Sequence, residues 1–320
     1  MSSERIWVLA DDRPGNVAQC VGVAEALGRP FKLFDVRYNR WGALHNLIRW
    51  DSRRGLTRDC RKQLEAPWPE LVIGAGRRTA PLSRWFKRKF GSKLVQIMDP
   101  GWPGRRDFDL IAAPRHDDMP DAPNVIHTMG SCHRARPERL AAEAALWAPR
   151  LGALSRPYLT LVVGGTTKDY PFGLDVAAQL IDQTVALANS MGATILATTS
   201  RRTGAAIEAM LSERLPLRSH LHIWRDGAEN PYMGFLGLAD AIVVTGDSMN
   251  MCSEASANGG PVYIFSPPGL VNDKHARLHE LLVELGYARF LGGDPTPWRH
   301  PPLNAALDVA RAVLDRGLIR

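Results

Sequence analysis

The chain has 320 residues, 45% of them hydrophobic, and a mean hydropathy of −0.18. It can bury a large core, so the composition excludes a disordered or low-complexity protein, and the length favours about two domains. The formal net charge of +7 and isoelectric point of about 9.5 suit nucleic acid, an anionic membrane surface or a phosphorylated ligand, without choosing among them.

The cysteines and the apolar runs bear on the compartment. The four cysteines are widely spaced and form neither a C-x-x-C pair nor a zinc-site pattern, which predicts reduced, buried thiols. The stretch MSSERIWVLADD has no signal-peptide core, and no apolar run reaches the ~18–20 residues of a membrane-spanning helix. We therefore expect a cytoplasmic protein that is soluble or peripheral on the inner face of the membrane.

The first half of the sequence alternates apolar strand candidates with helical segments. A helix is predicted over 17–28, where Gly28 supplies a stop signal. Strands that alternate with helices form parallel sheets covered on both faces, so this half predicts an α/β domain. Its strands are expected at 5–10, 31–36, 70–76, 93–99, 108–114 and 125–130.

A second series of elements starts after the SRPY segment at 155–158. Helices are expected at about 173–191, 203–214 and 231–240, with another after 246 and a last one at about 302–317. The strands between them are expected at 159–165, 193–200, 221–224, 242–246 and 261–266.

The chain is therefore predicted to be α/β, with two Rossmann-like domains facing a cleft. The first domain is expected at 1–150 and the second at 151–300, joined near 145–157. The segment 301–320 is expected to form a C-terminal helix that can return to the first domain.

Turns rich in small or charged residues follow seven of the predicted strands. Ligands of open α/β sheets bind beyond the carboxyl ends of the strands, so this distribution predicts a cleft that binds a polar ligand. The turns lie at 11–16, 74–80, 98–104, 164–173, 199–204, 224–232 and 245–250.

Two of these turns offer groups that could meet a phosphate. GGTTKDYPFG contains Gly165, Thr166, Thr167 and Lys168, which combine backbone N–H groups, hydroxyls and a cation. Its spacing is not that of a Walker A loop, and the alternative is a tight turn with a solvent-exposed lysine. The next turn adds Ser200, Arg201 and Arg202.

The stretch VVTGDSMNMCSEASANGGPVYIF at 243–265 predicts a strand, a short polar turn, a helix and a second strand. Asp247, Ser248, Met249 and Asn250 would bring the helix N-terminal amides to the sheet edge, where they favour a diphosphate. The alternative is that Asp247 or Ser248 only caps the helix. Glu254, about a turn and a half further on, is suited to accept hydrogen bonds from ribose hydroxyls.

These segments resemble two known groups. TGDSMNMCSEASANGGPVYIFSPPG is similar to the donor half of GT-B glycosyltransferases, particularly the lipid-linked N-acetylglucosaminyltransferase of peptidoglycan synthesis. LADDRPGNVAQCVGVAEALG, VGGTTKDYPFG and NPYMGFLGLADAIVVTGDSMNMCSEA resemble the mitochondrial fission ELM-type family, of which this chain would be a bacterial member. The second resemblance spans nearly the whole sequence.

The resemblance to GT-B enzymes implies a GT-B-like fold and a site for a nucleoside-diphosphate sugar, with a UDP-sugar favoured. It makes Glu254 the ribose partner and gives Ser248, Met249 and Asn250 backbone contacts to the diphosphate. Gly165, Thr166 and Lys168 would face the diphosphate or the sugar. The sugar nucleotide would be a donor substrate, and neither a permanently bound cofactor nor a metal is expected.

The catalytic base is the point at which this sequence departs from the transferase pattern. The transferases carry a glycine-rich loop and a histidine near the N-terminus, whereas this chain has DDRPGN, which leaves Asp11 or Asp12 as the base. Alternatively, these aspartates cap the following helix or pair with Arg13. His133 is a reserve candidate, although a lone histidine is more often a structural hydrogen-bonder.

Two basic segments with interleaved aromatic residues, 38–62 and 84–93, predict a peripheral membrane contact. The alternative is an amphipathic helix packed on the sheet with a solvated basic face. No nucleic-acid reader motif accompanies the basic residues, so nucleic acid is not expected as a partner. An acceptor that is lipid-linked or a polysaccharide would fit.

Two further motifs give only weak evidence for a metal site or a dinucleotide site. The DFD at 107–109 matches a metal-binding D-x-D but opens an apolar strand at its amino end, away from the expected cleft. GAGRRT at 74–79 lacks the third glycine of a dinucleotide fingerprint, and no clear helix opening is expected after it. The sequence thus supports a metal-independent glycosyltransferase, with a non-catalytic adaptor at a membrane surface as the alternative.

Overall fold

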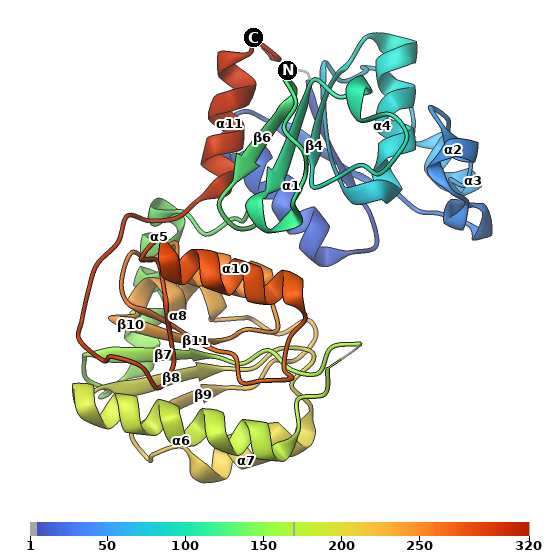
Figure 1. The fold of residues 1–320 in the computed structure, drawn as a ribbon. Helices are drawn as coiled ribbons and strands as arrows, with labels where there is room; N and C mark the ends of the chain where they lie inside the picture. The colour runs from blue at the N-terminus through green and yellow to red at the C-terminus, as the bar shows by residue number, and fades with distance from the viewer. Residues whose placement is uncertain (1–4, 169, 320) are drawn as a thin grey trace. The chain divides into compact units, whose positions relative to one another are not determined.

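The computed structural model describes residues 5–168 and 170–319 (Figure 1). The chain divides into two compact units, one formed by the residues up to Arg134 together with those from Asn304 onward, the other by Ala135–Leu303. Each unit contains a six-stranded sheet in which every paired strand is parallel to its neighbour. The expected α/β class with two Rossmann-like units is confirmed.

The sheet of the first unit has the strand order β2-β1-β3-β4-β5-β6. The order reverses direction between β1 and β3, so the carboxyl ends of these two strands flank a topological switch point. The strands are β1 (Ile6–Ala10), β2 (Phe31–Asp35), β3 (Leu71–Ala75), β4 (Lys93–Ile97), β5 (Leu110–Pro114) and β6 (Val125–Thr128).

Side chains that alternate along the strands give this sheet two apolar faces. Ile6 and its neighbours on one face pack against α1 (Pro14–Ala26) and α11 (Ala305–Asp315). Trp7 and the opposite face pack against α4 (Gly76–Phe90). Figure 1 shows α4 and α11 on opposite sides of this sheet.

The segment 38–62 forms three short pieces rather than one amphipathic helix: η1 (Arg40–Ala43), α2 (Asn46–Arg49) and α3 (Arg58–Lys62). It exposes large apolar side chains, as the expected membrane contact of this segment requires. The exposed fractions are 53% for Trp41, 53% for Leu47, 52% for Ile48 and 42% for Trp50.

The aromatic side chains of 84–93 lie in the core, contrary to the expectation of a membrane contact there. Phe86 is fully buried and meets the Trp7 ring edge-on at 5.4 Å, and Phe90 stacks on Trp68 at 4.1 Å. Burial of these rings in water-excluded packing stabilises the unit more than exposure would. Arg88, Lys89 and Lys93 of this segment are exposed, and Lys87 and Arg88 are paired with Asp109 and Asp51.

The sheet of the second unit has the strand order β12-β11-β10-β7-β8-β9. Counted from β7, this is the 3-2-1-4-5-6 order of dinucleotide-binding folds, with its switch point between β7 and β10. The strands are β7 (Tyr158–Val162), β8 (Thr194–Thr198), β9 (His220–His222), β10 (Ala241–Thr245), β11 (Val262–Phe265) and β12 (Arg289–Phe290).

Helices cover both faces of this second sheet, and Figure 1 shows α6 and α8 on opposite sides of it. The central strand β10 pairs with β7 and β11, so that Val243 lies beside Leu161 and Tyr263. The helices are α5 (Pro137–Trp147), α6 (Leu174–Met191), α7 (Ala205–Arg214), α8 (Tyr232–Leu238), α9 (Met249–Ala255) and α10 (Asp273–Glu284).

Helix α5 explains why the units divide at Arg134, whereas the sequence suggested 150. It packs tightly against α8: a Cβ atom added at Gly237 would lie only 2.2 Å from the Leu140 carbonyl oxygen. The Trp147 ring also meets Phe235 edge-on, with the ring centres 6.1 Å apart. The segment before the expected boundary therefore belongs to the second unit.

The expected strands all form, but besides the short α2 and α3 the described residues contain three longer helices that the sequence interpretation did not assign. They are α4, α5 and α10. In particular, α4 begins at Gly76, which corrects the expectation that no helix opens after GAGRRT. Short 3-10 segments complete the chain: η2 (Arg105–Asp107), η3 (Arg115–Asp117) and η4 (Ala148–Leu151). Among the described residues, no helix combines the length and apolar character needed to cross a membrane.

Candidate functional site

Two segments meet at the switch point of the second sheet. Gly164 and Gly165 lie beyond β7, and Asp247 lies beyond β10. The Gly165 amide donates to Asp247 Oδ2 at 3.1 Å, and the Gly164 amide donates to the Thr245 hydroxyl at 2.8 Å. A Cβ atom at Gly164 would stand 2.2 Å from Asp247 Oδ1, so this approach requires glycine.

Arg202 closes the same cluster from the turn after β8. Its Nη2 atom lies 2.6 Å from Asp247 Oδ2, and its Nη1 donates to the Gly165 carbonyl at 3.0 Å. The Asp247 side chain is 0% exposed and that of Arg202 is 32% exposed. A buried carboxylate requires a counter-charge, so this ion pair fixes the turn after β7 to the turn after β10.

Several donors that the sequence analysis assigned to a diphosphate are thus bonded within the protein. The Gly165 amide and the Arg202 guanidinium contact Asp247, which takes the position of an internal anion. The Thr166 amide donates to the Arg202 carbonyl at 3.2 Å, and the Thr167 amide donates to the Tyr170 carbonyl at 2.9 Å. In this conformation, the turn after β7 is a structural clasp.

Of the other candidates in these turns, one is bonded within the protein and two are exposed. The Ser200 hydroxyl donates to the Gly164 carbonyl at 2.7 Å and so belongs to the clasp. Lys168 and Arg201 are exposed.

Helix α9 follows β10 directly, as the sequence predicts. Ser248 is its N-cap, and the hydroxyl accepts a hydrogen bond from the Met251 amide at 3.4 Å. Met249 and Asn250 form its first turn and are half-buried. First-turn amides have no partner within a helix, so these two point outward from the helix start.

Glu254 is half-buried on α9 and accepts a hydrogen bond from the Tyr232 hydroxyl at 2.6 Å. Tyr232 opens α8, so the pair joins two helices. Burial, followed by the charge of Glu254 and the hydrogen bond to it, raises the pKa of the Tyr232 phenol well above its ordinary value. The phenol therefore stays protonated and holds the Glu254 carboxylate in one orientation.

The two N-terminal aspartates differ in their surroundings. Asp11 is 7% exposed and accepts from the Arg13 amide at 3.1 Å and from Asn16 Nδ2 at 3.2 Å, so it shapes the turn into α1. Asp12 has a 62% exposed side chain and pairs with Arg78 at 2.7 Å, not with Arg13. Of the two carboxylates, that of Asp12 is the more accessible.

His133 and the DFD segment are held by packing and hydrogen bonds within the fold. His133 is 1% exposed, and a Cβ atom at Gly22 would lie 2.5 Å from its carbonyl oxygen, so the segment is packed closely on α1. Asp109 accepts from Lys87 Nζ at 3.0 Å and from the Leu94 amide at 2.8 Å. Over residues 5–168 and 170–319, no group of three or more His, Cys, Asp or Glu side chains could hold a metal ion.

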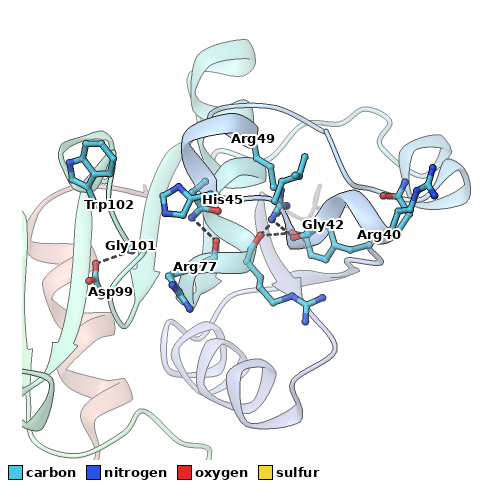
Figure 2. Close-up of a pocket in the computed structure, with 13 residues that line it drawn as sticks. Arg40, Gly42, His45, Arg49, Arg77, Asp99, Gly101 and Trp102 are labelled. Atoms are coloured by element: carbon cyan, nitrogen blue, oxygen red, sulfur yellow. Dashed lines mark hydrogen bonds between the residues drawn. The ribbon is translucent and has the colours of Figure 1, made fainter.

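The first unit contains a second candidate site, a pocket of about 610 Å³ beyond β2, β3 and β4 (Figure 2). Its lining comes from three places: the segment after β2, the start of α4 and the turn after β4. The lining residues are Tyr38, Asn39, Arg40, Gly42, Leu44, His45, Asn46 and Arg49, then Arg77 and Arg78, then Asp99, Gly101 and Trp102. Figure 2 shows Arg77 close to His45 and facing the loop that carries Asp99 and Trp102.

Hydrogen bonds tie the three walls of this pocket together. The buried Asn46 side chain donates to the Arg77 carbonyl at 2.9 Å and to the Pro100 carbonyl at 3.2 Å. The Tyr38 hydroxyl donates to the Arg78 carbonyl at 2.6 Å. These bonds span residues far apart in the sequence, so the pocket is built into the fold.

The fold places the chain among proteins with the GT-B fold. Its structure is similar to UDP-GlcNAc 2-epimerase from Methanocaldococcus jannaschii, with a TM-score of 0.53 and 10% identity over 97% of this chain and 99% of that one. A structure of that epimerase in complex with UDP-GlcNAc and UDP matches with a TM-score of 0.50 and 11% identity, over the same shares of both chains. At such identities the likeness shows the fold.

The protein belongs to the Mitochondrial fission ELM1 family, whose model matches residues 14–317. It is 29% identical to an uncharacterised protein of Rickettsia prowazekii, over 96% of this chain and 97% of that protein. It is also 29% identical to the mitochondrial fission protein ELM1 of Arabidopsis thaliana, over 82% of this chain and 68% of that protein. The expected family and GT-B fold are confirmed.

Sequence reasoning did not identify Tyr232 as a site residue. It also did not recognise that the arginines of the pocket in the first unit belong to one site. The turns at 74–80 and 98–104 were recognised as polar strand ends. Arg49, however, was grouped with a surface segment, because a short helix of four residues has no periodicity to show which side chain points inward. Tyr232 had only its place at the start of an expected helix as a signal.

Proposed function

We propose that the second unit binds a nucleoside-diphosphate sugar, with a UDP-sugar favoured, and that the protein transfers this sugar to a membrane-associated or polysaccharide acceptor. The proposal rests on Glu254, which is held by the Tyr232 phenol on the helix that follows β10. That helix starts at the switch point of a sheet with dinucleotide-binding strand order.

A carboxylate in this position suits the ribose of a nucleotide. Tyr232 donates to one oxygen of Glu254 and, because its pKa is raised, does not remove the proton from a ligand hydroxyl. Glu254 therefore acts as an oriented acceptor for ribose hydroxyl donors. The exposed cations Lys168 and Arg201 offset the charge of the diphosphate, a role that needs no metal.

In the transfer step, the acceptor hydroxyl oxygen forms a bond to the anomeric carbon of the sugar. The bond between that carbon and the diphosphate oxygen breaks, and its electron pair leaves with the nucleoside diphosphate. The hydroxyl proton passes to a carboxylate, and Asp12 is preferred to Asp11 because its side chain is 62% exposed. Asp11 is buried and already accepts two hydrogen bonds.

A second candidate function is that of a non-catalytic adaptor at a membrane surface. The observation in its favour is the exposure of Trp41, Leu47 and Ile48 within the basic segment 38–62. A relative of this chain is named for mitochondrial fission, which is compatible with recruitment rather than catalysis. The two functions differ in whether a nucleotide is bound.

The test is a thermal-shift and calorimetric titration with UDP, GDP, CMP, ADP and their sugar conjugates. A ligand of the folded state raises the midpoint of unfolding, and we expect a selective shift with one nucleotide. Glu254→Gln should weaken this binding by about tenfold, since a charged acceptor becomes a neutral amide. Tyr232→Phe should weaken it less, because the carboxylate remains but is no longer oriented.

Glu284→Gln on the exposed face of α10 is the matched control and should bind as the unaltered protein does. Absence of a response to every nucleotide would rule out the donor site and favour the adaptor. An equal loss in the Glu254 and Glu284 variants would also contradict the assignment.

A further inference from the structure

The pocket of the first unit gathers positive charge at the edge of a sheet where α/β proteins bind ligands. The arginines among its lining residues are Arg40, Arg49, Arg77 and Arg78, and Asp99 is the carboxylate. Arg105 holds Asp99 with two hydrogen bonds of 2.9 and 2.6 Å, and Arg78 is paired with Asp12. In the described part of the chain, the remaining three arginines form no ion pair with these carboxylates.

Arg49 is the most unusual of these groups, because its guanidinium is buried. The residue is 2% exposed, and it donates to the carbonyls of Gly42 and Arg78 at 3.1 and 3.3 Å. Among the described residues its Nε atom has no hydrogen-bond partner, no ion pair to it is found, and its guanidinium lies 4.6 Å from the centre of the Tyr38 ring. A buried cation without a counter-ion is costly, so an anion in the pocket would offset that cost.

The N-terminus of α4 adds to the positive electrostatic potential of the pocket. Its N-cap, Ala75, provides no side-chain hydrogen bond, and its first turn contains Arg77 and Arg78. Helix N-termini are positive and are ordinarily accompanied by acidic side chains, so two arginines there are unfavourable in isolation. They become favourable when an anion occupies the space that they line.

The remaining lining groups narrow the chemistry of the ligand. His45 Nδ1 accepts from the Leu47 amide at 3.2 Å, so the neutral ring carries its proton on Nε2 and is a donor there. Trp102 is 69% exposed and offers a ring face at the loop after β4. The pocket thus combines several donors with one aromatic surface, and its volume exceeds what a lone carboxylate fills.

We propose that this pocket binds the phosphate or diphosphate group of a phosphorylated ligand, with Arg77 and Arg49 on the anion and Trp102 against the organic part. Arginine forks match phosphate oxygens in pairs, which favours phosphate over a single carboxylate. The inference is independent of the nucleotide site in the second unit. The phosphate group can come from a soluble ester or from a lipid headgroup.

The first experiment titrates the full-length protein with inorganic pyrophosphate and with glycerol 3-phosphate by calorimetry, and follows the unfolding midpoint. We expect pyrophosphate to bind and to raise the midpoint. Arg77→Gln should weaken binding about tenfold or more, the loss typical of a charge-assisted hydrogen bond. This residue is exposed, so the variant should fold.

Three more variants make the test specific. Arg106→Gln removes the same charge from an exposed position outside the pocket and should change the affinity less than twofold. Arg49→Lys keeps the buried charge but loses the fork, so it should bind pyrophosphate more weakly than the unaltered protein. Glu254→Gln should leave pyrophosphate binding by this pocket unchanged, which separates this inference from the proposed nucleotide site.

Vesicles distinguish the source of the phosphate. Vesicles with phosphatidic acid carry a phosphomonoester, and vesicles with phosphatidylglycerol, matched in surface charge, carry a phosphodiester. A preference for the former that Arg77→Gln abolishes identifies a lipid headgroup, whereas binding of soluble esters without this preference identifies a soluble ligand. Absence of pyrophosphate binding, together with equal binding to both vesicles, would overturn the proposal. An equal loss in the Arg77 and Arg106 variants would overturn it as well.

Discussion

At the residue scale, the second unit depends on the close contact between Gly165 and the turn after β8. Gly165 has φ +154°, and a Cβ atom there would lie 2.1 Å from the Arg202 carbonyl oxygen. The Arg202 carbonyl belongs to the backbone, so relief requires a shift of the main chain. The glycine lets Asp247 and Arg202 form their buried ion pair.

We predict that Gly165→Ala lowers the free energy of unfolding by about 3 kcal/mol or more, because strain and a backbone clash add to each other. Gly204→Ala is the matched control: Gly204 also has positive φ, +85°, but no atom lies within 4 Å of the added Cβ. It should cost only about 1–2 kcal/mol, because the backbone conformation at Gly204, with φ +85° and ψ 149°, is one that residues with a side chain rarely adopt. Urea unfolding measures both, and equal losses would contradict the clash.

The same cluster shows why sequence alone assigned these residues to a diphosphate. Glycine amides and an arginine at strand ends are the groups that bind phosphate, and an internal carboxylate uses the same donors. Asp247 lies 82 residues from Gly165 in the sequence, so nothing local predicts that the two meet. Glu254 lies on the expected helix α9, and Ser248 is the N-cap of that helix, which the sequence analysis gave as the alternative to a diphosphate contact.

At the element scale, β9 forms an edge of the second sheet and carries His220 and His222. Burial lowers the pKa of His220, and burial followed by the charge of His220 lowers that of His222. The unfolded chain therefore takes up protons before the folded chain does. Stability is complete above the unfolded pKa of about 6.5 and is lost as the pH falls below it.

We predict that the double variant His220→Asn/His222→Gln loses less stability than the unaltered protein between pH 7.5 and 5.5. Urea unfolding at several pH values provides the measurement. Burial also lowers the pKa of His275, so a residual dependence should persist. Above pH 7.5 the free energies of unfolding of the variant and the unaltered protein should depend on pH in the same way. If the pH dependence below pH 6.5 is the same in the variant, other groups cause the loss of stability.

Strands were predicted more completely than helices, and the missed helices share a physical reason. Buried parallel strands are short apolar runs and are visible in the sequence. Helix α4 begins with Gly76 and the two arginines and contains Pro81, so its first turns lack both a cap and the usual composition. The pocket of the first unit depends on this start, which is why the sequence did not reveal it.

At the scale of the whole molecule, the two sheets use different strand orders, and the sequence does not determine them. Local patterns identify strands, but their order in a sheet depends on packing between segments far apart in the chain. The same holds for α11, whose amphipathic pattern shows that it is a helix without showing which face it covers. In the structure it packs against α1, from the opposite end of the chain.

This arrangement makes the first unit depend on the last residues of the chain. Val309 on α11 is fully buried with Ala305, Ala306, Ala310 and Val313 in the core that includes β1. A carboxylate there would have neither water nor a cation, and burial of an unpaired charge costs several kcal/mol. We therefore predict that Val309→Asp unfolds the first unit selectively.

Limited proteolysis with mass spectrometry of the fragments tests this selectivity. In Val309→Asp, cleavage should spread through the residues up to Arg134, while Ala135–Leu303, which has its own core, should resist. Leu307→Asp is the matched control on the same helix: Leu307 is 40% exposed and lies in the first turn, where an acidic side chain is tolerated. A unit with a core of its own should stay folded when the other unit unfolds. Cleavage of both units at equal rates in Val309→Asp would therefore contradict the prediction and show that the two units unfold cooperatively.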